Sequence, residues 1–205
     1  MATTTTKESE VIVPEGQAAP IVTETPQGTS VVFGGQTQGT TVVAKEGTTV
    51  VSGEKTTGSS FQLGAGANLV FADYKLKKSD ISGDDGANEV DAEGTVAKKA
   101  SFELGGGVDS VAFGDGSVVK KSSINLGAGA DEVLFSGGSK VTKTDIDLGS
   151  DSDADTIIIE DGADIKKLTL KNFGPEDELI IGGRTFTSDD IVDGKIPGFD
   201  FISFE

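Results

Sequence analysis

The sequence predicts an all-β protein, a single parallel β-solenoid with coils of about 22 residues. Three observations predict this fold. A Gly-x-Asn/Asp signature recurs along the chain, apolar residues alternate after each signature, and 29 glycines are available for turns. The residues at the Asn/Asp position of the signature, here called anchors, lie 20, 21, 22, 24 and 22 residues apart: Asn68, Asn88, Asp109, Asp131, Asp155 and Asp177.

Each predicted coil contains two or three short strands. Alternating apolar positions after each anchor are typical of a strand with one face inward. These positions hold Val70/Ala72, Val90/Ala92, Val111/Phe113, Val133/Phe135, Ile157/Ile159 and Leu179/Ile181. A second apolar strand precedes each anchor, at Phe61/Leu63, Ile81, Phe102/Leu104, Ile124/Leu126, Ile146/Leu148 and Leu168/Leu170. A third apolar position recurs at Leu76, Val96, Val118, Val141 and Ile165.

The two ends of the chain differ from the repeats. Residues 1–27 are rich in Thr, Glu and Pro, which predicts an extended N-terminal arm, held either by a partner subunit or by its own domain. Residues 28–182 form the solenoid, and they open with half-units such as GTSVV at Gly28 and GTTVV at Gly39. Residues 183–205 concentrate phenylalanines, so we expect a cap that covers the last coil.

Composition excludes several kinds of chemistry. The chain has no Cys and no His, which excludes disulfides, thiolate metal sites and imidazole catalysis. Seventeen basic residues against 34 acidic ones give a net charge of −17, which argues against binding to nucleic acid. The longest apolar runs are too short to cross a membrane, and the first ten residues do not form a Sec signal peptide. We therefore expect synthesis in a cytoplasm and no membrane insertion.

The turns before the inward strands resemble a known calcium-binding repeat. They read LGAGANLV from Leu63, LGGGVDSV from Leu104 and LGAGADEV from Leu126. They resemble, in degenerate form, the RTX (hemolysin-type) nonapeptide G-G-x-G-x-D-x-U-x, with Leu in place of the first Gly. The resemblance implies a β-roll in which turn carbonyls and Asp carboxylates hold Ca²⁺. It points to five candidate ligands: Asp109, Asp131, Asp151, Asp153 and Asp155.

Two alternatives remain open for these features. Gly-Asn/Asp turns also suit tight corners that require left-handed backbone conformations, with no metal bound. The RTX resemblance further implies type I secretion, with which the acidic, Phe-rich tail FDFISFE is compatible. A hydrophobic cap accounts for the same tail.

Lysines recur at one phase of five successive coils. This row, here called the lysine stripe, contains eleven of the 17 basic residues: Lys75, Lys77, Lys78, Lys98, Lys99, Lys120, Lys121, Lys140, Lys143, Lys166 and Lys167. The stripe is interpreted either as a solvated face that resists aggregation or as an edge that docks on an acidic neighbour, including the acidic edge of another copy.

Three functions are compatible with these patterns, and we expect a protein that is not an enzyme. The first is a rigid structural subunit of an extracellular or virion assembly, bound through its N-terminal arm to its own copies or to a shell or scaffold protein. In overall architecture the chain resembles the decoration, cement and fibre proteins of tailed-phage virions. The second is a secreted, calcium-binding RTX-like surface or matrix protein. The third is a polysaccharide-binding or polysaccharide-cleaving module, although Tyr74 is the only Tyr, and there is no Trp to form an aromatic platform.

Overall fold

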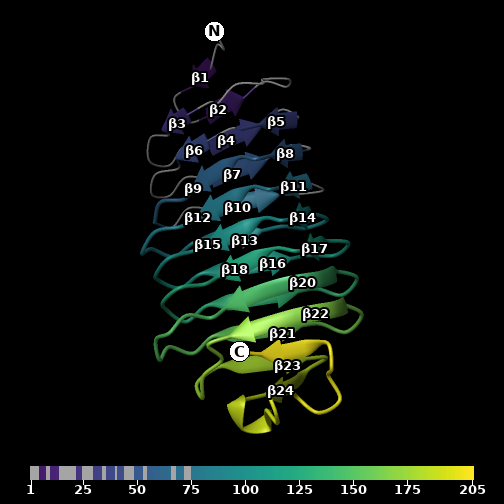
Figure 1. Ribbon diagram of the computed structural model, residues 1–205. Coiled ribbons are helices and arrows are strands. Elements are labelled where there is room, and N and C mark those ends of the chain that lie inside the picture. The colour runs from purple at the N-terminus through teal and green to yellow at the C-terminus, as the bar shows by residue number, and fades with distance from the viewer. Residues whose placement is uncertain are drawn as a thin grey trace.

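The computed structural model describes the backbone of residues 5–7, 10–13, 22–24, 30–33, 36–39, 41–43, 49–52, 55–65, 68–71 and 75–205. Side chains are described for residues 38–39, 41–43, 55–65 and 75–205. Over these residues the chain is an all-β parallel solenoid with coils of about 22 residues, as the repeat predicts (Figure 1). The described residues contain one helical turn, the 3-10 turn η1 (Ser188–Asp190).

One side of the solenoid is an 11-stranded sheet whose inner strands all run parallel. In sheet order its strands are β1 (Thr5–Lys7), β2 (Glu10–Val13), β4 (Ser30–Phe33), β7 (Thr49–Ser52), β10 (Asn68–Phe71), β13 (Glu89–Asp91), β16 (Ser110–Phe113), β19 (Glu132–Phe135), β21 (Thr156–Ile159), β23 (Glu178–Ile181) and β24 (Arg184–Phe186). The pairs β1–β2 and β23–β24 are antiparallel, so the chain reverses direction at both ends of this sheet.

The other strands form a 14-stranded sheet that contains two rows in each coil. One row consists of β5 (Gln36–Gln38), β8 (Lys55–Thr57), β11 (Lys75–Lys77), β14 (Val96–Lys98) and β17 (Val118–Lys120). The other consists of β3 (Val22–Glu24), β6 (Thr41–Val43), β9 (Ser60–Gln62), β12 (Asp80–Ser82), β15 (Ser101–Glu103) and β18 (Ser123–Asn125). The long strands β20 (Lys140–Asp147) and β22 (Asp164–Lys171) continue both rows, and β25 (Ile202–Phe204) pairs with β22.

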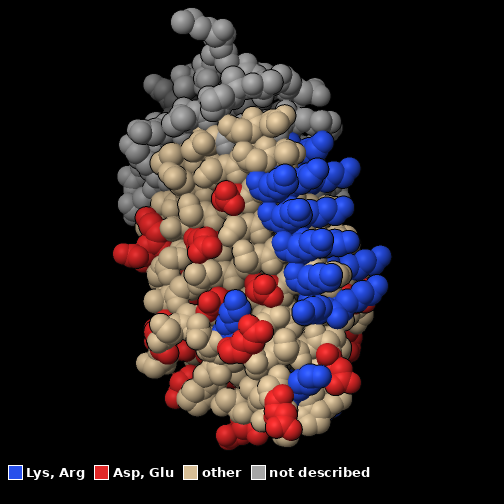
Figure 2. Space-filling view, viewed as in Figure 1, with Lys and Arg blue, Asp and Glu red and all other residues tan. Residues whose placement is uncertain are grey.

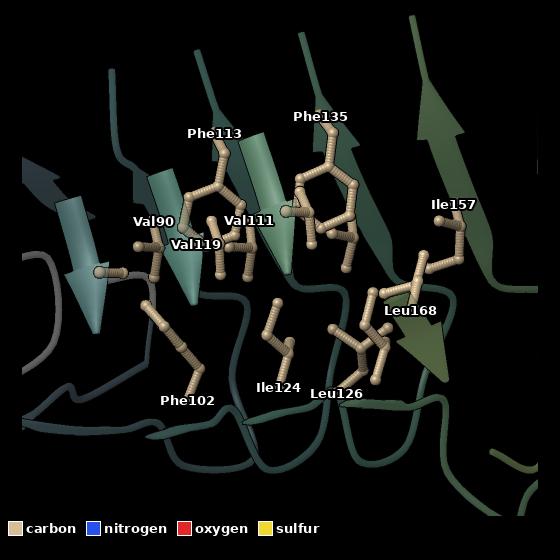
Figure 3. Packing of buried hydrophobic residues seen from close by; sticks show 14 of the residues in the cluster. Val90, Phe102, Val111, Phe113, Val119, Ile124, Leu126, Phe135, Ile157 and Leu168 are labelled. Atoms are coloured by element: carbon tan, nitrogen blue, oxygen red, sulfur yellow. The ribbon is translucent and has the colours of Figure 1, made fainter. Parts of the chain in front are cut away.

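Apolar side chains fill the solenoid in rows that follow the strand register. Val90, Val111, Val133, Ile157 and Leu179 pair from coil to coil and are fully buried. Figure 3 shows several of these side chains facing those of the opposite sheet. The rings of Phe113 and Phe135 stack with centroids 5.5 Å apart and an 8° angle between their planes. Side chains at equivalent positions of adjacent coils therefore pack on one another, as a regular repeat requires.

Two predicted registers are wrong by one residue. Asn68 pairs with Glu89 and not with Asn88, so the first anchor lies one position out of phase with the later anchors. In the third apolar row, Ala97 and Val119 are buried, whereas Val96 and Val118 are only partly buried. Consecutive apolar residues in these three-residue strands left the inward position ambiguous in the sequence.

The segment predicted as an N-terminal arm, 1–27, contains three described strands. Glu10–Val13 pairs in parallel with β4, and Val22–Glu24 pairs in parallel with β6. These two strands therefore continue the sheets of the solenoid, and Thr5–Lys7 pairs antiparallel with Glu10–Val13. The remaining residues of the predicted arm lie outside the described residues. The half-units at Gly28 and Gly39 lead into β4 and β6, which belong to different sheets.

At the other end, phenylalanines gather over the last coil, as expected for residues 183–205. The ring centroids of Phe186 and Phe199 lie 5.2 Å apart, and those of Phe199 and Phe201 lie 5.7 Å apart. Phe204 in β25 contacts Phe173 with centroids at 5.2 Å. No helix in the described part of the chain has the length and apolar character needed to span a membrane.

Candidate functional site

Four aspartates at successive anchors form a line of hydrogen bonds along the rod, here called the aspartate ladder: Asp109, Asp131, Asp155 and Asp177. In each, Oδ1 accepts a hydrogen bond from the backbone N–H of the anchor in the preceding coil. The N–O distances are 2.7 Å from Asn88 to Asp109, 2.7 Å from Asp109 to Asp131, 2.9 Å from Asp131 to Asp155 and 3.0 Å from Asp155 to Asp177. These four aspartates point inward because they share the phase of the apolar residues two positions later, which are buried.

Burial gives these carboxylates unusual protonation behaviour. The side chains are between 1% and 4% exposed, and removal from water raises the pKa of Asp109 to about 6 and those of Asp131 and Asp155 to about 7. The backbone N–H donors oppose this rise. Neighbouring carboxylates add to it, including Asp109 and Asp155 beside Asp131. At neutral pH the middle of the ladder therefore shares protons among its carboxyl groups.

Two ladder atoms have no partner. Oδ2 of Asp109 and Oδ2 of Asp131 are buried and form no hydrogen bond. By contrast, the amide of Asn88 at the equivalent position donates from Nδ2 to the Gly86 carbonyl, the Leu104 carbonyl and Asp109 Oδ1. The Nδ2 group of Asn88 thus finds three acceptors, although its Oδ1, like Oδ2 of Asp109 and of Asp131, is buried without a partner.

The turns require glycine because the backbones of adjacent coils approach each other closely there. Gly127 and Gly129 have φ angles of +101° and +125°, and a Cβ on either would overlap the carbonyl oxygen of Gly105 or Gly107 in the preceding coil. The Gly105 carbonyl accepts a hydrogen bond from the Ala128 N–H at 2.9 Å. The Gly-x-Gly part of the motif therefore allows the coils to stack closely.

The other two predicted ligands, Asp151 and Asp153, lie apart from the ladder hydrogen bonds. Both are exposed, and the Asp153 N–H donates to Asp151 Oδ1 at 2.9 Å. They line a cavity of about 120 Å³, together with Asp155, Glu176 and Asp177. The structure thus groups Asp151, Asp153 and Asp155 at one turn and places Asp109 and Asp131 in the preceding coils.

Calcium prefers six to eight oxygen ligands. Within the described residues, no three acidic side chains are placed to hold a metal ion together. The Oδ1 atoms of the ladder already accept backbone N–H groups, so Oδ2 of Asp109 and Oδ2 of Asp131 are the ladder oxygens left without a partner. As arranged, the turns do not provide the complete oxygen cage of an RTX site.

The lysine stripe forms a band of basic side chains along one edge of the rod (Figure 2). All eleven lysines are exposed. Lys77, Lys98 and Lys120 are Cα partners in adjacent strands, so their side chains are separated by the spacing of one coil, about 4.8 Å. The structure therefore brings the predicted stripe together.

The stripe contains a second row in which the backbone is left-handed. Lys78, Lys99, Lys121 and Lys143 have φ angles of 51°, 55°, 55° and 54°. The backbone N–H groups of the first three donate to the next coil in the same way as Gly39 and Gly58 do in earlier coils. A left-handed conformation costs a non-glycine residue roughly 1–2 kcal/mol. Glycine is thus replaced by lysine in four consecutive coils, at an energetic cost to the fold.

Within the described residues the stripe has few compensating charges. Of the two ion pairs in the described part of the chain, Lys166–Asp164 at 3.6 Å involves a lysine of the stripe, and Lys195–Asp200 at 3.9 Å lies outside it. Between the rows lies a groove of about 210 Å³, lined by lysines alone: Lys77, Lys98, Lys99, Lys120 and Lys121. An anion in this groove would meet ammonium groups from three successive coils.

Comparison of the chain with family models, with curated proteins and with solved structures found no match. The architecture itself defines the class of protein, a β-solenoid of about six turns.

The sequence did not reveal that Asn88 and Asp177 belong to the site around the aspartate ladder, or that four lysines of the stripe have left-handed backbone. Asn88 and Asp177 were aligned as anchors but were not chosen as site residues, although the repeat placed them in the same row. The left-handed lysines could have been found from the replacement of Gly39 and Gly58 by lysine at the equivalent turn in later coils.

Proposed function

We propose that this chain is a non-enzymatic structural protein, a rigid β-solenoid subunit of an extracellular or virion assembly. The supporting observation is the aspartate ladder. The carboxylates nearest to a catalytic or metal-binding arrangement are buried, and each gives one oxygen to the backbone of the adjacent coil. Carboxylates of the kind that could bind a metal or take part in catalysis are thereby used to join coils. This use favours a load-bearing or display role.

In this proposal the subunit contacts its neighbour through the lysine stripe. Like charges repeat along the stripe, and four lysines have left-handed backbone, so both features oppose stability. A surface that costs stability in several coils is best explained by contact with an anionic partner. Because Glu10–Val13 and Val22–Glu24 pair with the solenoid, the proposed contact rests on the stripe and not on the N-terminal segment.

Limited trypsin digestion tests the rigidity that this function requires. Trypsin cleaves after lysine, and the stripe exposes its lysines at the surface, but cleavage requires local opening of the paired strands. We expect the segment from Lys75 to Lys171 to remain uncut under conditions that digest the urea-unfolded chain completely. Rapid cleavage after Lys99 or Lys121 in the folded protein would refute a rigid scaffold.

A second candidate function is calcium binding by an RTX-like protein exported by type I secretion. The observation that favours it is the pair of buried, unpartnered oxygens, Asp109 Oδ2 and Asp131 Oδ2. Thermal melting with 5 mM CaCl₂ as a probe (roughly 5- to 50-fold above an extracellular-type dissociation constant of about 10⁻⁴–10⁻³ M), and again with EDTA, separates the two functions. An increase in melting temperature of several degrees with calcium supports the RTX-like function. Equal melting temperatures support the metal-free structural role.

A further inference from the structure

We infer that the lysine stripe binds a linear polysaccharide that carries a carboxylate on each sugar. The inference rests on the proposed function and names the partner of the same surface. The groove between the two lysine rows receives the polymer, and its walls are formed by lysine side chains alone, which present ammonium groups from three coils.

The spacing of the charges supports a polymer of this kind. Coils repeat at about 4.8 Å, and each coil of the groove contributes neighbouring lysines such as Lys98 and Lys99. One pyranose ring with its glycosidic oxygen extends a chain by nearly the same distance. A polyuronate thus places one carboxylate opposite each coil, between two rows of ammonium groups. Lysine suits this role because it acts as a mobile point charge and does not require bidentate geometry.

Charge density argues against nucleic acid as the partner. Duplex DNA carries one charge per about 1.7 Å, or about three charges over the roughly 4.8 Å of one coil, against two groove lysines in that coil, and the net charge of −17 repels the unpaired phosphates. Proteins that bind single strands stack bases on aromatic side chains, and no aromatic residue lines this groove. A polymer with one charge per sugar meets the least repulsion from the rest of the rod.

A second copy of the chain fits the stripe less well. On the turn that follows the strands β13, β16 and β21, the acidic residues are Glu93, Asp115, Glu160 and Asp161. The equivalent turn after β19 contains Ser136 and Gly137 instead. This acidic row is therefore interrupted and does not match the lysine stripe coil by coil.

The test is fluorescence anisotropy with labelled, unbranched oligogalacturonates of increasing length and the full chain in 50 mM NaCl. The methyl ester of the same oligomer serves as an uncharged control, and an oligo-dT of equal length serves as the nucleic-acid control. We expect binding of the free acid that strengthens with each added sugar and weakens at least about tenfold between 50 and 200 mM NaCl. We expect no comparable binding of the ester or of oligo-dT.

Variants locate the binding on the stripe. Lys98→Gln combined with Lys120→Gln removes two groove lysines and should weaken binding at least tenfold. The matched control, Arg184→Gln combined with Lys195→Gln, removes two exposed basic residues outside the stripe and should stay within about twofold of the parent. Urea melts check that both variants fold.

Three results would overturn the inference: no binding at 50 mM NaCl, equal binding of the ester, or oligo-dT binding as tight as that of the acid. Sedimentation provides a further criterion. If the chain self-associates and the double variant abolishes this association, the stripe joins copies of the chain and the inference is wrong. A rod that resists trypsin but does not bind oligogalacturonate refutes this inference while leaving the proposed structural function intact.

Discussion

Replacing Asp131 by Asn should stabilise the protein at pH 8. Asp131 is 2% exposed, burial raises its pKa to about 7, and its Oδ2 has no hydrogen-bond partner. The amide cannot ionise, and its oxygen can still accept the backbone N–H of Asp109. Asn88 demonstrates that an amide can be accommodated at a ladder position, where its Nδ2 donates to three acceptors.

The magnitude follows from the difference between the folded and unfolded pKa values. A change from 3.8 to about 7, at about 1.4 kcal/mol per pH unit, corresponds to about 4 kcal/mol of unfolding free energy above pH 7. Because Asp109, Asp131 and Asp155 titrate together, we expect about 2–4 kcal/mol for one substitution. For a chain of this size, that difference raises the melting temperature by roughly 5–15 °C.

The sign of the pH dependence is fixed by the same values. A carboxyl group with a raised pKa in the folded state favours folding below its unfolded pKa, and this contribution is lost as the pH rises to about 7. The gain from Asp131→Asn should therefore already be roughly 40% of its full value at pH 5, increase up to about pH 7 and stay constant above it. Urea melts from pH 5.0 to 8.5 measure this gain and avoid the region around the isoelectric point of 4.3.

Asp151→Asn is the matched control, since it removes the same charge from an exposed position in the neighbouring coil. Its effect should remain below about 0.5 kcal/mol at every pH. Equal gains from the two variants would assign the effect to net charge and refute the argument from burial. A loss of stability in Asp131→Asn at pH 8 would refute it as well.

Three further predictions concern stacking, strain and the core. Gly129→Ala should lower the free energy of unfolding by more than about 3 kcal/mol, because its Cβ would overlap the Gly107 carbonyl oxygen. Gly116→Ala places its Cβ in open space and should lower the free energy of unfolding by about 1 kcal/mol. Urea melts of the two variants measure the difference. Lys99→Gly should stabilise the protein by about 1 kcal/mol, because glycine adopts the left-handed backbone without strain. Lys98→Gly, in the strand β14, should destabilise the protein. Differential scanning calorimetry measures both changes. Phe135→Ala should cost about 3–5 kcal/mol in chemical denaturation, and an effect below 1 kcal/mol would contradict the stacked phenylalanine core.

The fold was predictable from sequence because a solenoid repeats one local rule. The inward strand after each anchor was found correctly from Val90 onward, because the anchor sets the phase even where neighbouring residues are all apolar, as at positions 157–159. The phase was lost where adjacent apolar residues have no anchor before them, as in Val118 and Val119. There the left-handed turn at Lys121 and the pairing with Val141 determine which residue is buried, and neither is visible in the local pattern.

The site was less predictable because an aspartate beside a glycine turn has the same sequence pattern whether it faces a cation or a neighbouring backbone N–H. Only the stacking distance between coils decides between the two. Asp109 and Asp131 are close enough to the preceding coil for Oδ1 to accept its N–H. Three of the five residues to which the RTX resemblance points, Asp109, Asp131 and Asp155, therefore lie in one row, but the resemblance could not determine what occupies the space beside them.

Two rows of like charge run along the same rod, and their different access to water determines what each can do. The buried aspartate ladder can lower its repulsion by binding protons, so its effect on the protein depends on pH. The exposed lysine stripe is solvated, and its repulsion is reduced by counterions or by an anionic polymer, so its effect depends on salt. The two dependences should therefore separate: Asp131→Asn should change the pH profile of stability and leave the salt dependence of oligogalacturonate binding unchanged. Substitution of Lys98 and Lys120 should do the reverse. Coupling between the two profiles would show that the charge rows do not act independently.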